Sequence, residues 1–386
     1  MERVSIIGAG AMGSGIAQVA ASYGHEVVLY DYFPEALQAA ELKLAKIFDR
    51  LIEKNRMSSL QAIEIKQRII YSNKLESIES SDLIIEAVVE NIEVKKNLFS
   101  SMETMVSKNC ILASNTSSLS ITSIAGACKI PERVIGIHFF NPAPLMPLVE
   151  IIPAIQSSEI FIEKGKSLID SWNKITVLAK DTPGFIVNRV ARPFYGEAIR
   201  ILEEGWANIA TIDWAMKELG GFPMGPFELM DYIGHDVNYV VTETVFKEFF
   251  FDPRYKPSFS QKRLIEANRL GRKSGHGFYN YKKKELNPAP SIDEKLGAKI
   301  VNRVVCLLIN EAIDAFFMNI ASEKDIDIAM TKGVNYPKGL LAWANEKGLI
   351  NVLAELEELF NTYGEDRYRP SPLLKKMVQE KTQFFS

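Results

Sequence analysis

The chain has 386 residues, of which 47% are hydrophobic and 24% are charged, and its formal net charge is −3 at pH 7. This length predicts two or three domains with ample core, and the near-neutral charge argues against nucleic acid or an anionic membrane as the main partner. No apolar stretch reaches transmembrane length and no signal peptide precedes the first expected strand, so we expect a cytoplasmic protein. The three cysteines, Cys110, Cys128 and Cys306, show no metal-binding spacing, which predicts buried thiols in a reducing compartment and no metal site.

A glycine-rich turn follows the first apolar run, Val4–Ile7, which predicts a buried strand. In the G-x-G-x-x-G pattern, one glycine allows the tight turn, the next lets the backbone approach a pyrophosphate, and the third lets the helix pack on the strand. The N-terminus of that helix then offers N–H groups and a positive dipole end to phosphates. The predicted dinucleotide contacts of this turn are Gly8, Gly10, Ala11, Met12 and Gly13.

An acidic residue follows the second expected strand, Val27–Tyr30, after a helix with one apolar face. Asp31 stands where a carboxylate can bind the 2′-hydroxyl of an adenosine ribose, and it would repel a 2′-phosphate. The sequence therefore favours NAD over NADP as cofactor.

Strand-like and helical segments alternate over about the first 180 residues. The later expected strands are 82–89, 110–113, 134–140, 148–152 and 175–178. This alternation predicts an α/β Rossmann-type, doubly wound and mostly parallel sheet, in an NAD-binding domain over residues 1–182. The charged insertion 39–74 is expected to be a helical pair that projects from the sheet and is not part of it.

Beyond Asp181-Thr182-Pro183-Gly184 the pattern is only helical, and residues recur at a fixed offset of 114. The recurring pairs include Asn188/Asn302, Arg189/Arg303, Glu197/Glu311 and Asp213/Asp327. We expect two all-α units, residues 183–282 and 298–386, joined by a linker over 283–297 and packed about a pseudo-two-fold axis. A monomer with this internal pseudo-dimer is favoured over a homodimer, and the two arginines are expected to be structural.

One of the four histidines stands at the end of an expected strand, in Gly136-Ile137-His138-Phe139-Phe140-Asn141-Pro142. Ligands bind at this edge of open α/β sheets, and a histidine suits the role of base for a hydroxyl proton. Glu150 lies twelve residues later in an apolar run, and the turn between them can bring it against His138. A core histidine with Glu150 in a surface ion pair explains the spacing about as well. The other histidines are expected to be structural (His25) or to have no obvious carboxylate partner (His235 and His276).

Several longer strings carry a family resemblance. They are IIGAGAMGSGIA, DLIIEAVVENIEVKK, ASNTSSLSIT, HFFNPAPLMPLVEI, DTPGFIVNR, GFPMGPFELMDYIG and GRKSGHGFYNYK, and they cover nearly all of residues 1–282 in order. The chain resembles the L-3-hydroxyacyl-CoA dehydrogenase family, in particular bacterial 3-hydroxybutyryl-CoA dehydrogenases. Its doubled helical unit is similar to that of multifunctional fatty-acid oxidation proteins.

The resemblance implies NAD-dependent, reversible oxidation of a short- or medium-chain (3S)-3-hydroxyacyl-CoA to the 3-oxoacyl-CoA, with the substrate between the sheet domain and the first helical unit. It implies that His138 is the catalytic base and Glu150 its orienting partner. Ser117 and Asn188 would contact the substrate, and Lys54 its coenzyme A. Further cofactor contacts would be Asp31, Glu90, Lys95, Asn115, Ser117, Asn141 and Lys273. Ile47 replaces a hydroxyl-bearing residue that contacts coenzyme A in the family.

Two other functions stay open at this point. The chain could be an NAD-dependent dehydrogenase of a free hydroxy or sugar acid, against which Lys54 and the inserted helices argue. It could also be a non-enzymatic, crystallin-like NAD-binding protein, which would need neither His138 nor Glu150. Chain length and direction of the reaction are not predicted.

Overall fold

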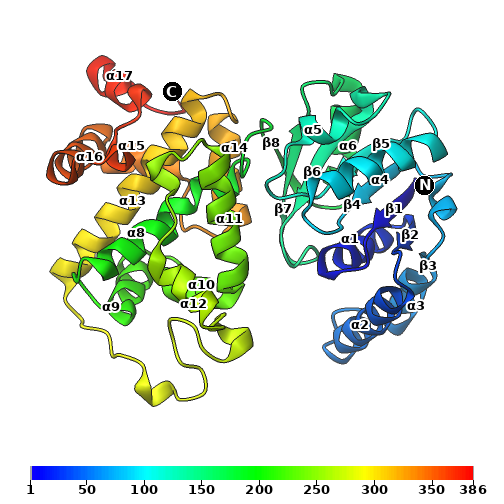
Figure 1. The fold of residues 1–386 in the computed structure, drawn as a ribbon, viewed down its shortest axis with the longest axis horizontal. Coiled ribbons are helices and arrows are strands. Elements are labelled where there is room, and N and C mark those ends of the chain that lie inside the picture. Colours follow the sequence, from blue (N-terminus) through cyan, green and yellow to red (C-terminus); the bar gives the residue numbers. More distant parts are fainter. Residues whose placement is uncertain (1, 386) are drawn as a thin grey trace. The chain divides into compact units, whose positions relative to one another are not determined.

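The computed structural model describes residues 2–385 and divides into two compact units between Thr182 and Pro183. We call residues 2–182 the sheet unit and residues 183–385 the helical unit. A Rossmann-like sheet with helices is followed by an all-helical part, as the sequence predicts (Figure 1).

The sheet unit is built on eight strands in the order β3-β2-β1-β4-β5-β6-β7-β8. Strands β1 to β6 run parallel, β7 is antiparallel to β6, and β8 is parallel to β7. The strands are β1 (Arg3–Ile7), β2 (Glu26–Tyr30), β3 (Ile69–Ser72), β4 (Leu83–Glu86), β5 (Ile111–Ser114), β6 (Val134–Phe139), β7 (Leu148–Pro153) and β8 (Ile175–Leu178). The strand order reverses at β1, the switch point where such sheets bind ligands.

Both faces of the sheet are covered, because its strands are apolar on both sides. Alternate residues of β1, β2, β4, β5, β6 and β7 share one core cluster with side chains of α1, α2, α3 and α6, which includes the fully buried Trp172. The helices of this unit are α1 (Ala11–Ser22), α2 (Pro34–Glu53), α3 (Ser59–Gln67), α4 (Ile92–Met105), α5 (Ile121–Ala125) and α6 (Glu159–Ser171). Helices α4 and α5 contact each other, and α5 packs on β6 and β7.

The insertion after β2 differs from the expectation in its last residues. Helices α2 and α3 lie side by side and extend beyond the sheet, as predicted (Figure 1). However, Ile69–Ser72 is strand β3, which pairs in parallel with β2 at the edge of the sheet. Its four residues follow closely on a helix and only Ile69 is buried, so the segment lacks the apolar run that marks the central strands.

The expected strand 82–89 ends at Glu86. The side chain of Glu86 accepts a hydrogen bond from the backbone N–H of Val88 at 2.7 Å and turns the chain out of the sheet. The apolar residues that continue after this point belong to the loop and not to the strand.

The helical unit contains eleven α-helices among its described residues. They are α7 (Val187–Val190), α8 (Arg192–Glu203), α9 (Ile209–Trp214), α10 (Pro226–Ile233), α11 (His235–Glu248), α12 (Phe259–Glu266), α13 (Glu294–Phe317), α14 (Glu323–Gly333), α15 (Leu340–Lys347), α16 (Leu349–Tyr363) and α17 (Pro372–Glu380). The long helix α13 packs along α8 (Figure 1).

Two buried ion pairs join α13 to the first part of the helical unit. Arg189 Nε lies 2.6 Å from Glu311 Oε1, and Arg303 Nη2 lies 2.5 Å from Glu197 Oε1. All four side chains are at most 3% exposed. Arg189 and Arg303 correspond to each other at the offset of 114, and so do their partners Glu311 and Glu197. Both arginines therefore have the structural role expected of them.

The remaining histidines have buried or half-buried partners. His25 accepts a hydrogen bond from the indole N–H of Trp172 at 2.9 Å, which fits its expected structural role. His235 does have a carboxylate partner, contrary to the expectation, because its Nε2 lies 2.7 Å from Asp231 Oδ1 and both side chains are fully buried. His276 contacts the backbone carbonyl of Gly277.

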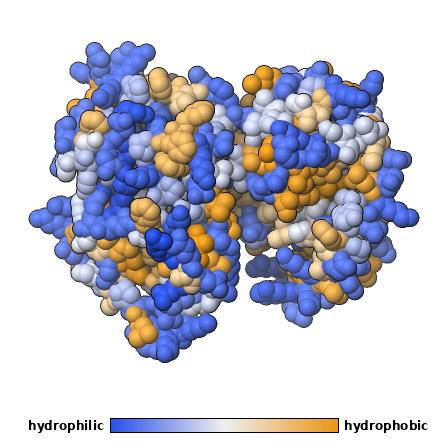
Figure 2. Space-filling view, viewed as in Figure 1, coloured by the Kyte–Doolittle hydropathy of each residue, from blue (hydrophilic) through white to orange (hydrophobic). Residues whose placement is uncertain are grey.

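Hydrophilic residues cover most of the drawn face of each unit, and apolar residues form separate patches (Figure 2). Among residues 2–385, no helix combines the length and apolar character needed to cross a bilayer.

Candidate active site

The glycine turn after β1 has the shape that a dinucleotide requires. Gly8 has φ +104°, and a Cβ at Gly13 would lie 1.8 Å from the carbonyl oxygen of Gly8. Gly10, in contrast, has no atom within 4 Å of the place of a Cβ, which leaves room for a phosphate at the backbone. No side chain caps α1, so the N–H groups of Ala11 and Met12 in its first turn are available to a ligand. The turn therefore fits the pyrophosphate of NAD.

Asp31 follows β2 and lies against this turn. Its Oδ2 accepts the N–H of Ala9 at 2.7 Å, and its Oδ1 accepts the N–H of Phe33 at 3.0 Å. These two bonds fix the carboxylate beside the glycines, where it can accept further hydrogen bonds from the hydroxyls of a ribose.

A buried lysine lies between two glutamates, one at the end of β4 and the other in the loop that follows it. Lys95 is 1% exposed, and its Nζ lies 2.6 Å from Glu86 Oε1 and 3.3 Å from Glu90 Oε2. Glu86 is fully buried and also accepts the hydroxyl of Ser114 at 2.7 Å. Glu86 is not among the residues predicted from the sequence, although an acidic residue inside an apolar strand is the same signal that marks Glu150.

Glu90 joins the loop after β4 to the loop after β5. Its Oε1 accepts the hydroxyl of Thr116 at 2.5 Å and the N–H of Ser117 at 3.1 Å. One residue earlier than Thr116, Asn115 accepts the N–H of Phe139 at 2.8 Å and so ties the end of β5 to the end of β6. These bonds position the loop of Ser117 at the carboxyl edge of the sheet.

His138 and Glu150 form a buried pair on β6 and β7. The antiparallel register places the two residues opposite each other, and His138 Nδ1 lies 2.7 Å from Glu150 Oε2. Glu150 is 0% exposed and His138 is 5% exposed, so Glu150 is not in a surface ion pair. Because an ionised carboxylate only accepts hydrogen bonds, Nδ1 carries the ring proton and Nε2 is the basic nitrogen of the neutral imidazole.

A lysine on the sheet unit binds the backbone of the loop 141–147, which joins β6 to β7. Lys174 Nζ donates to the carbonyls of Ala143 and Met146 at 2.6 and 2.8 Å. Burial lowers the pKa of Lys174 to about 8. Asn141 is exposed at the start of this loop, next to the strand that carries His138.

The structure brings most of the expected site residues of the sheet unit to one edge of the sheet. They are Gly8, Gly10, Ala11, Met12, Gly13, Asp31, Glu90, Lys95, Asn115, Ser117, His138 and Asn141, with Glu150 behind His138. Lys54 is exposed at the end of α2, on the projecting pair. Asn188 and Lys273 belong to the helical unit, in α7 and in the turn after α12, and Lys273 Nζ lies 2.6 Å from Asp236 Oδ1. No cluster of metal-ligating side chains occurs within residues 2–385.

Known protein families match both units. The NAD-binding domain of 3-hydroxyacyl-CoA dehydrogenases matches residues 3–182. The C-terminal domain of the same family matches residues 184–281 and 300–383. The chain belongs to the 3-hydroxyacyl-CoA dehydrogenase family. It is an NAD-dependent oxidoreductase that acts on hydroxyacyl-CoA thioesters, and the expected family, cofactor and activity are confirmed at this level.

Similar members of the 3-hydroxyacyl-CoA dehydrogenase family span the whole chain or its first three quarters. The 3-hydroxyadipyl-CoA dehydrogenase of Escherichia coli K12 is 37% identical and covers 97% of each chain. The human mitochondrial hydroxyacyl-coenzyme A dehydrogenase is 41% identical over 73% of this chain and 92% of its own. The crystal structure of a 3-hydroxybutyryl-CoA dehydrogenase from Escherichia coli K12 superposes with a TM-score of 0.92, at 36% identity, over 98% of both chains.

Proposed function

We propose that the enzyme oxidises short- or medium-chain (3S)-3-hydroxyacyl-CoA thioesters reversibly to 3-oxoacyl-CoA, with His138 as the base. The observation that carries this proposal is the buried His138–Glu150 pair, at the same sheet edge as the glycine turn. A protein that only binds NAD needs no such pair. A secondary alcohol needs both a hydride acceptor and a base.

In the proposed step, His138 Nε2 takes the proton of the 3-hydroxyl while the C3–H bond breaks and the C3–O bond becomes a carbonyl. NAD supplies the acceptor for the hydride that leaves C3. The imidazole becomes an imidazolium, and the adjacent carboxylate of Glu150 stabilises this charge without taking the proton itself. In the reverse direction, His138 returns the proton to the oxygen that forms.

We propose Ser117 and Asn188 as hydrogen-bond donors to the substrate oxygens. The bond from the Ser117 N–H to Glu90 supports the role of Ser117, because it holds the loop in place. Asn302, which corresponds to Asn188, donates to Glu355 and accepts from Lys347, both at 2.6 Å. The corresponding asparagine thus has a structural role, so the proposed contact of Asn188 with the substrate requires a separate test.

The remaining cofactor contacts are proposals of the same kind. We propose that Asp31 binds the adenosine ribose and that Glu90, Lys95, Asn115 and Asn141 lie along the cofactor. Lys273 is proposed as a further contact from the helical unit. The hydrogen bonds of Asp31 and Glu90 at the sheet edge support the first two roles.

Helix α2 supports binding of coenzyme A. Ala39, Leu42, Lys43, Lys46, Ile47 and Arg50 line a shallow groove along this helix. Lys54 stands one turn beyond Arg50. We propose that these cations bind the phosphates of coenzyme A, and that they compensate for the hydroxyl missing at Ile47.

We also propose that the helical unit is a duplication, with domains over 1–182, 183–282 and 298–386 and a linker over 283–297. The two matches to one domain family and the two exchanged arginine–glutamate pairs support it. A duplicated unit can satisfy its isologous surface within one chain, so the proposed state is a monomer. Light scattering at micromolar concentration should give the mass of one chain, and the mass of two chains would refute this state.

Three free cysteines support a cytoplasmic location. Cys110 and Cys306 are buried and Cys128 is half-buried. Burial raises the pKa of the Cys110 and Cys306 thiols to about 12 and that of Cys128 to about 11. Unpaired thiols are typical of proteins in reducing compartments.

The experiment that tests the proposed function is NADH oxidation with acetoacetyl-CoA, compared with free acetoacetate at equal concentration. We expect turnover of the thioester and at least 100-fold lower kcat/KM with the free acid. The triple variant Lys43→Ala/Lys46→Ala/Arg50→Ala should raise KM for the thioester and leave kcat unchanged. Equal use of both substrates would refute the role of coenzyme A. If the thioester is preferred, a series of longer 3-oxoacyl-CoA thioesters defines the chain length that the wild type accepts.

A further inference from the structure

Four arginines are buried among the described residues of the helical unit, and one of them differs from the rest. Arg189 and Arg303 form the two ion pairs described above. Arg367 Nε lies 2.6 Å from Glu365 Oε2. Arg192 is 6% exposed and pairs with no carboxylate within residues 183–385. Because a guanidinium keeps its charge in proteins, Arg192 is a buried cation without a counter-ion in this unit.

The partners of Arg192 are neutral groups. Its Nε donates to the backbone carbonyl of Asn188 at 2.6 Å, and its Nη1 donates to the hydroxyl of Thr242 at 2.9 Å. The centroid of the Tyr195 ring lies 4.9 Å from its Cζ. Burial lowers the pKa of Arg192, and the groups that oppose this effect are Tyr195 and Tyr336, not carboxylates. The side chain of Arg192 thus ties α7 to α11 through two hydrogen bonds.

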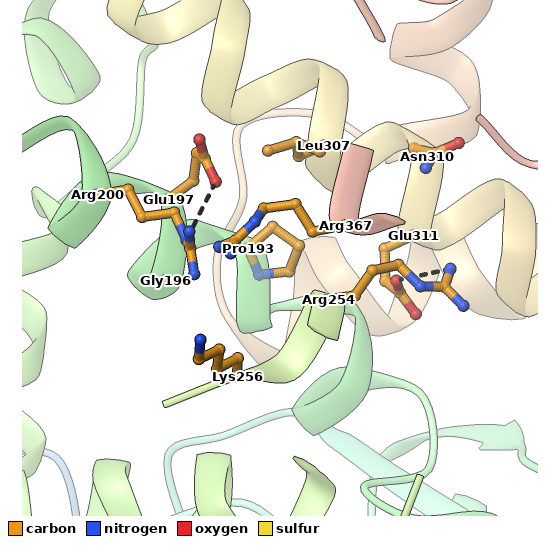
Figure 3. Close-up of a pocket in the computed structure, with 10 residues that line it drawn as sticks. All are labelled: Pro193, Gly196, Glu197, Arg200, Arg254, Lys256, Leu307, Asn310, Glu311 and Arg367. Carbon is orange, nitrogen blue, oxygen red and sulfur yellow. Dashed lines mark ion pairs between the residues drawn. The ribbon is translucent and has the colours of Figure 1, made fainter. Parts of the chain in front are cut away.

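A carboxylate is available farther along the same helix. Arg200 stands about two turns after Arg192 on α8 and lies 3.9 Å from a carboxylate oxygen of Glu197 (Figure 3). Both line a charged cavity of about 390 Å³, a volume that includes the solvent into which it opens. Pro193 also lines this cavity, whereas Arg192 does not. Ion pairing therefore explains the place of Arg200 and not that of Arg192.

The recurring sequence shows that the helix does not require a cation at this position. At the offset of 114, Cys306 corresponds to Arg192 and Asn302 to Asn188. Cys306 Sγ lies 3.7 Å from Asn302 Oδ1, and Asn302 is held through its side chain. Burying a cation without a counter-ion costs stability. Arg192 therefore has a role other than the packing of the helix.

We propose that Arg192 is a positioning residue for the reaction and holds Asn188 in place for the substrate. Asn188 is the substrate contact proposed above, so the role of Arg192 rests on that function. Thr242 is itself anchored, because its hydroxyl donates to the carbonyl of the buried Asn238 at 3.0 Å. A displacement of about 1 Å in a group that orients the substrate can lower a rate about 10²-fold. Activity, rather than stability, thus favours an arginine at position 192.

The test compares Arg192→Met with the wild type in NADH-dependent reduction of acetoacetyl-CoA. Methionine keeps a long side chain but removes both hydrogen bonds and the charge, so kcat should fall about 10- to 100-fold while the dissociation constant for NADH stays unchanged. The midpoint of thermal unfolding should not fall, since the buried charge is removed together with its hydrogen bonds. Arg200→Met is the matched control on the same helix and should keep the kcat of the wild type.

Arg192→Gln separates the hydrogen bond from the charge, because an amide can still donate to the carbonyl of Asn188. Its kcat should exceed that of Arg192→Met about threefold or more. Equal losses in the two variants would show that the charge matters and not the hold on the carbonyl, and would overturn the proposal.

The double variant Asn188→Ala/Arg192→Met tests whether Arg192 acts through Asn188. Its kcat should equal that of Asn188→Ala within about threefold, because the two losses are not independent. Losses that multiply would overturn the proposal, and so would a wild-type kcat in Arg192→Met beside an impaired Asn188→Ala. A wild-type kcat in Asn188→Ala would instead refute the proposed contact of Asn188 with the substrate, and the role of Arg192 with it.

Discussion

His138 and Glu150 are paired directly opposite each other on β6 and β7, and a buried hydrogen bond of 2.7 Å joins His138 Nδ1 to Glu150 Oε2. This register depends on the antiparallel direction of β7. The loop between β6 and β7 is too short to connect two neighbouring parallel strands. The carboxylate thereby fixes both the orientation and the tautomer of the imidazole.

The charge of Glu150 should matter more than its shape. Glu150→Gln keeps a similar side chain but removes the carboxylate that stabilises the imidazolium, so kcat with acetoacetyl-CoA should fall about 10²- to 10⁴-fold. Fluorescence titration should show unchanged NADH affinity. A kcat within threefold of the wild type would mean that Glu150 has only a structural role.

The glycine turn allows two substitutions with opposite outcomes. Gly10→Ala places its methyl group in open space, so the fold should keep its stability while NADH binding weakens at least 10-fold. Gly13→Ala would place the methyl group on the carbonyl of Gly8, so stability itself should fall. Thermal unfolding and NADH titration of both variants separate the two effects, and a normal NADH affinity in Gly10→Ala would contradict the assignment of the phosphate site.

The buried pair Glu86–Lys95 should dominate the stability of the loops at the sheet edge. Glu86→Gln leaves the charge of Lys95 without its nearest carboxylate and should lower the free energy of unfolding by about 3–5 kcal/mol. The exposed pair Lys96–Glu93 offers a matched control, in which Glu93→Gln should cost less than about 1 kcal/mol. Urea unfolding measures both, and equal losses would show that burial has no such effect here.

The three cysteines should react slowly with alkylating agents. At pH 8, a thiol with a pKa of about 11, as at Cys128, is ionised to only about one part in a thousand, and Cys110 and Cys306 are ionised still less. The thiolate fraction grows as the pH rises toward the pKa, so alkylation should speed up about tenfold per pH unit. Mass spectrometry after iodoacetamide treatment should find Cys128 modified first, and faster labelling of Cys110 would contradict the burial order.

How far the sequence predicts the site depends on the signal that each residue carries. An acidic residue inside an apolar strand must find a buried partner, and this reasoning leads from Glu150 to His138. The same reasoning applies to Glu86, but the apolar pattern continues to Val89 and does not reveal the turn that Glu86 makes with Val88. A hydrophobic pattern does not specify strand register or the exact end of a strand, and this limits how much of the site it predicts.

Contacts over longer distances are harder to derive. Strand β3 carries too few buried residues to stand out after two helices, and its place at the edge comes from pairing with β2. The pair His235–Asp231 has the i, i+4 spacing of one helix, yet Gly234 separates α10 from α11 between the two residues. Only the packed structure shows that their side chains still meet.

The most direct test of the account is the kcat of His138→Gln for NADH-dependent reduction of acetoacetyl-CoA, measured together with its dissociation constant for NADH. Glutamine keeps a polar side chain at the position but cannot exchange a proton with the substrate, so kcat should fall about 10³-fold or more while the NADH dissociation constant stays within twofold. A kcat within tenfold of the wild type would contradict the role of His138 as the base.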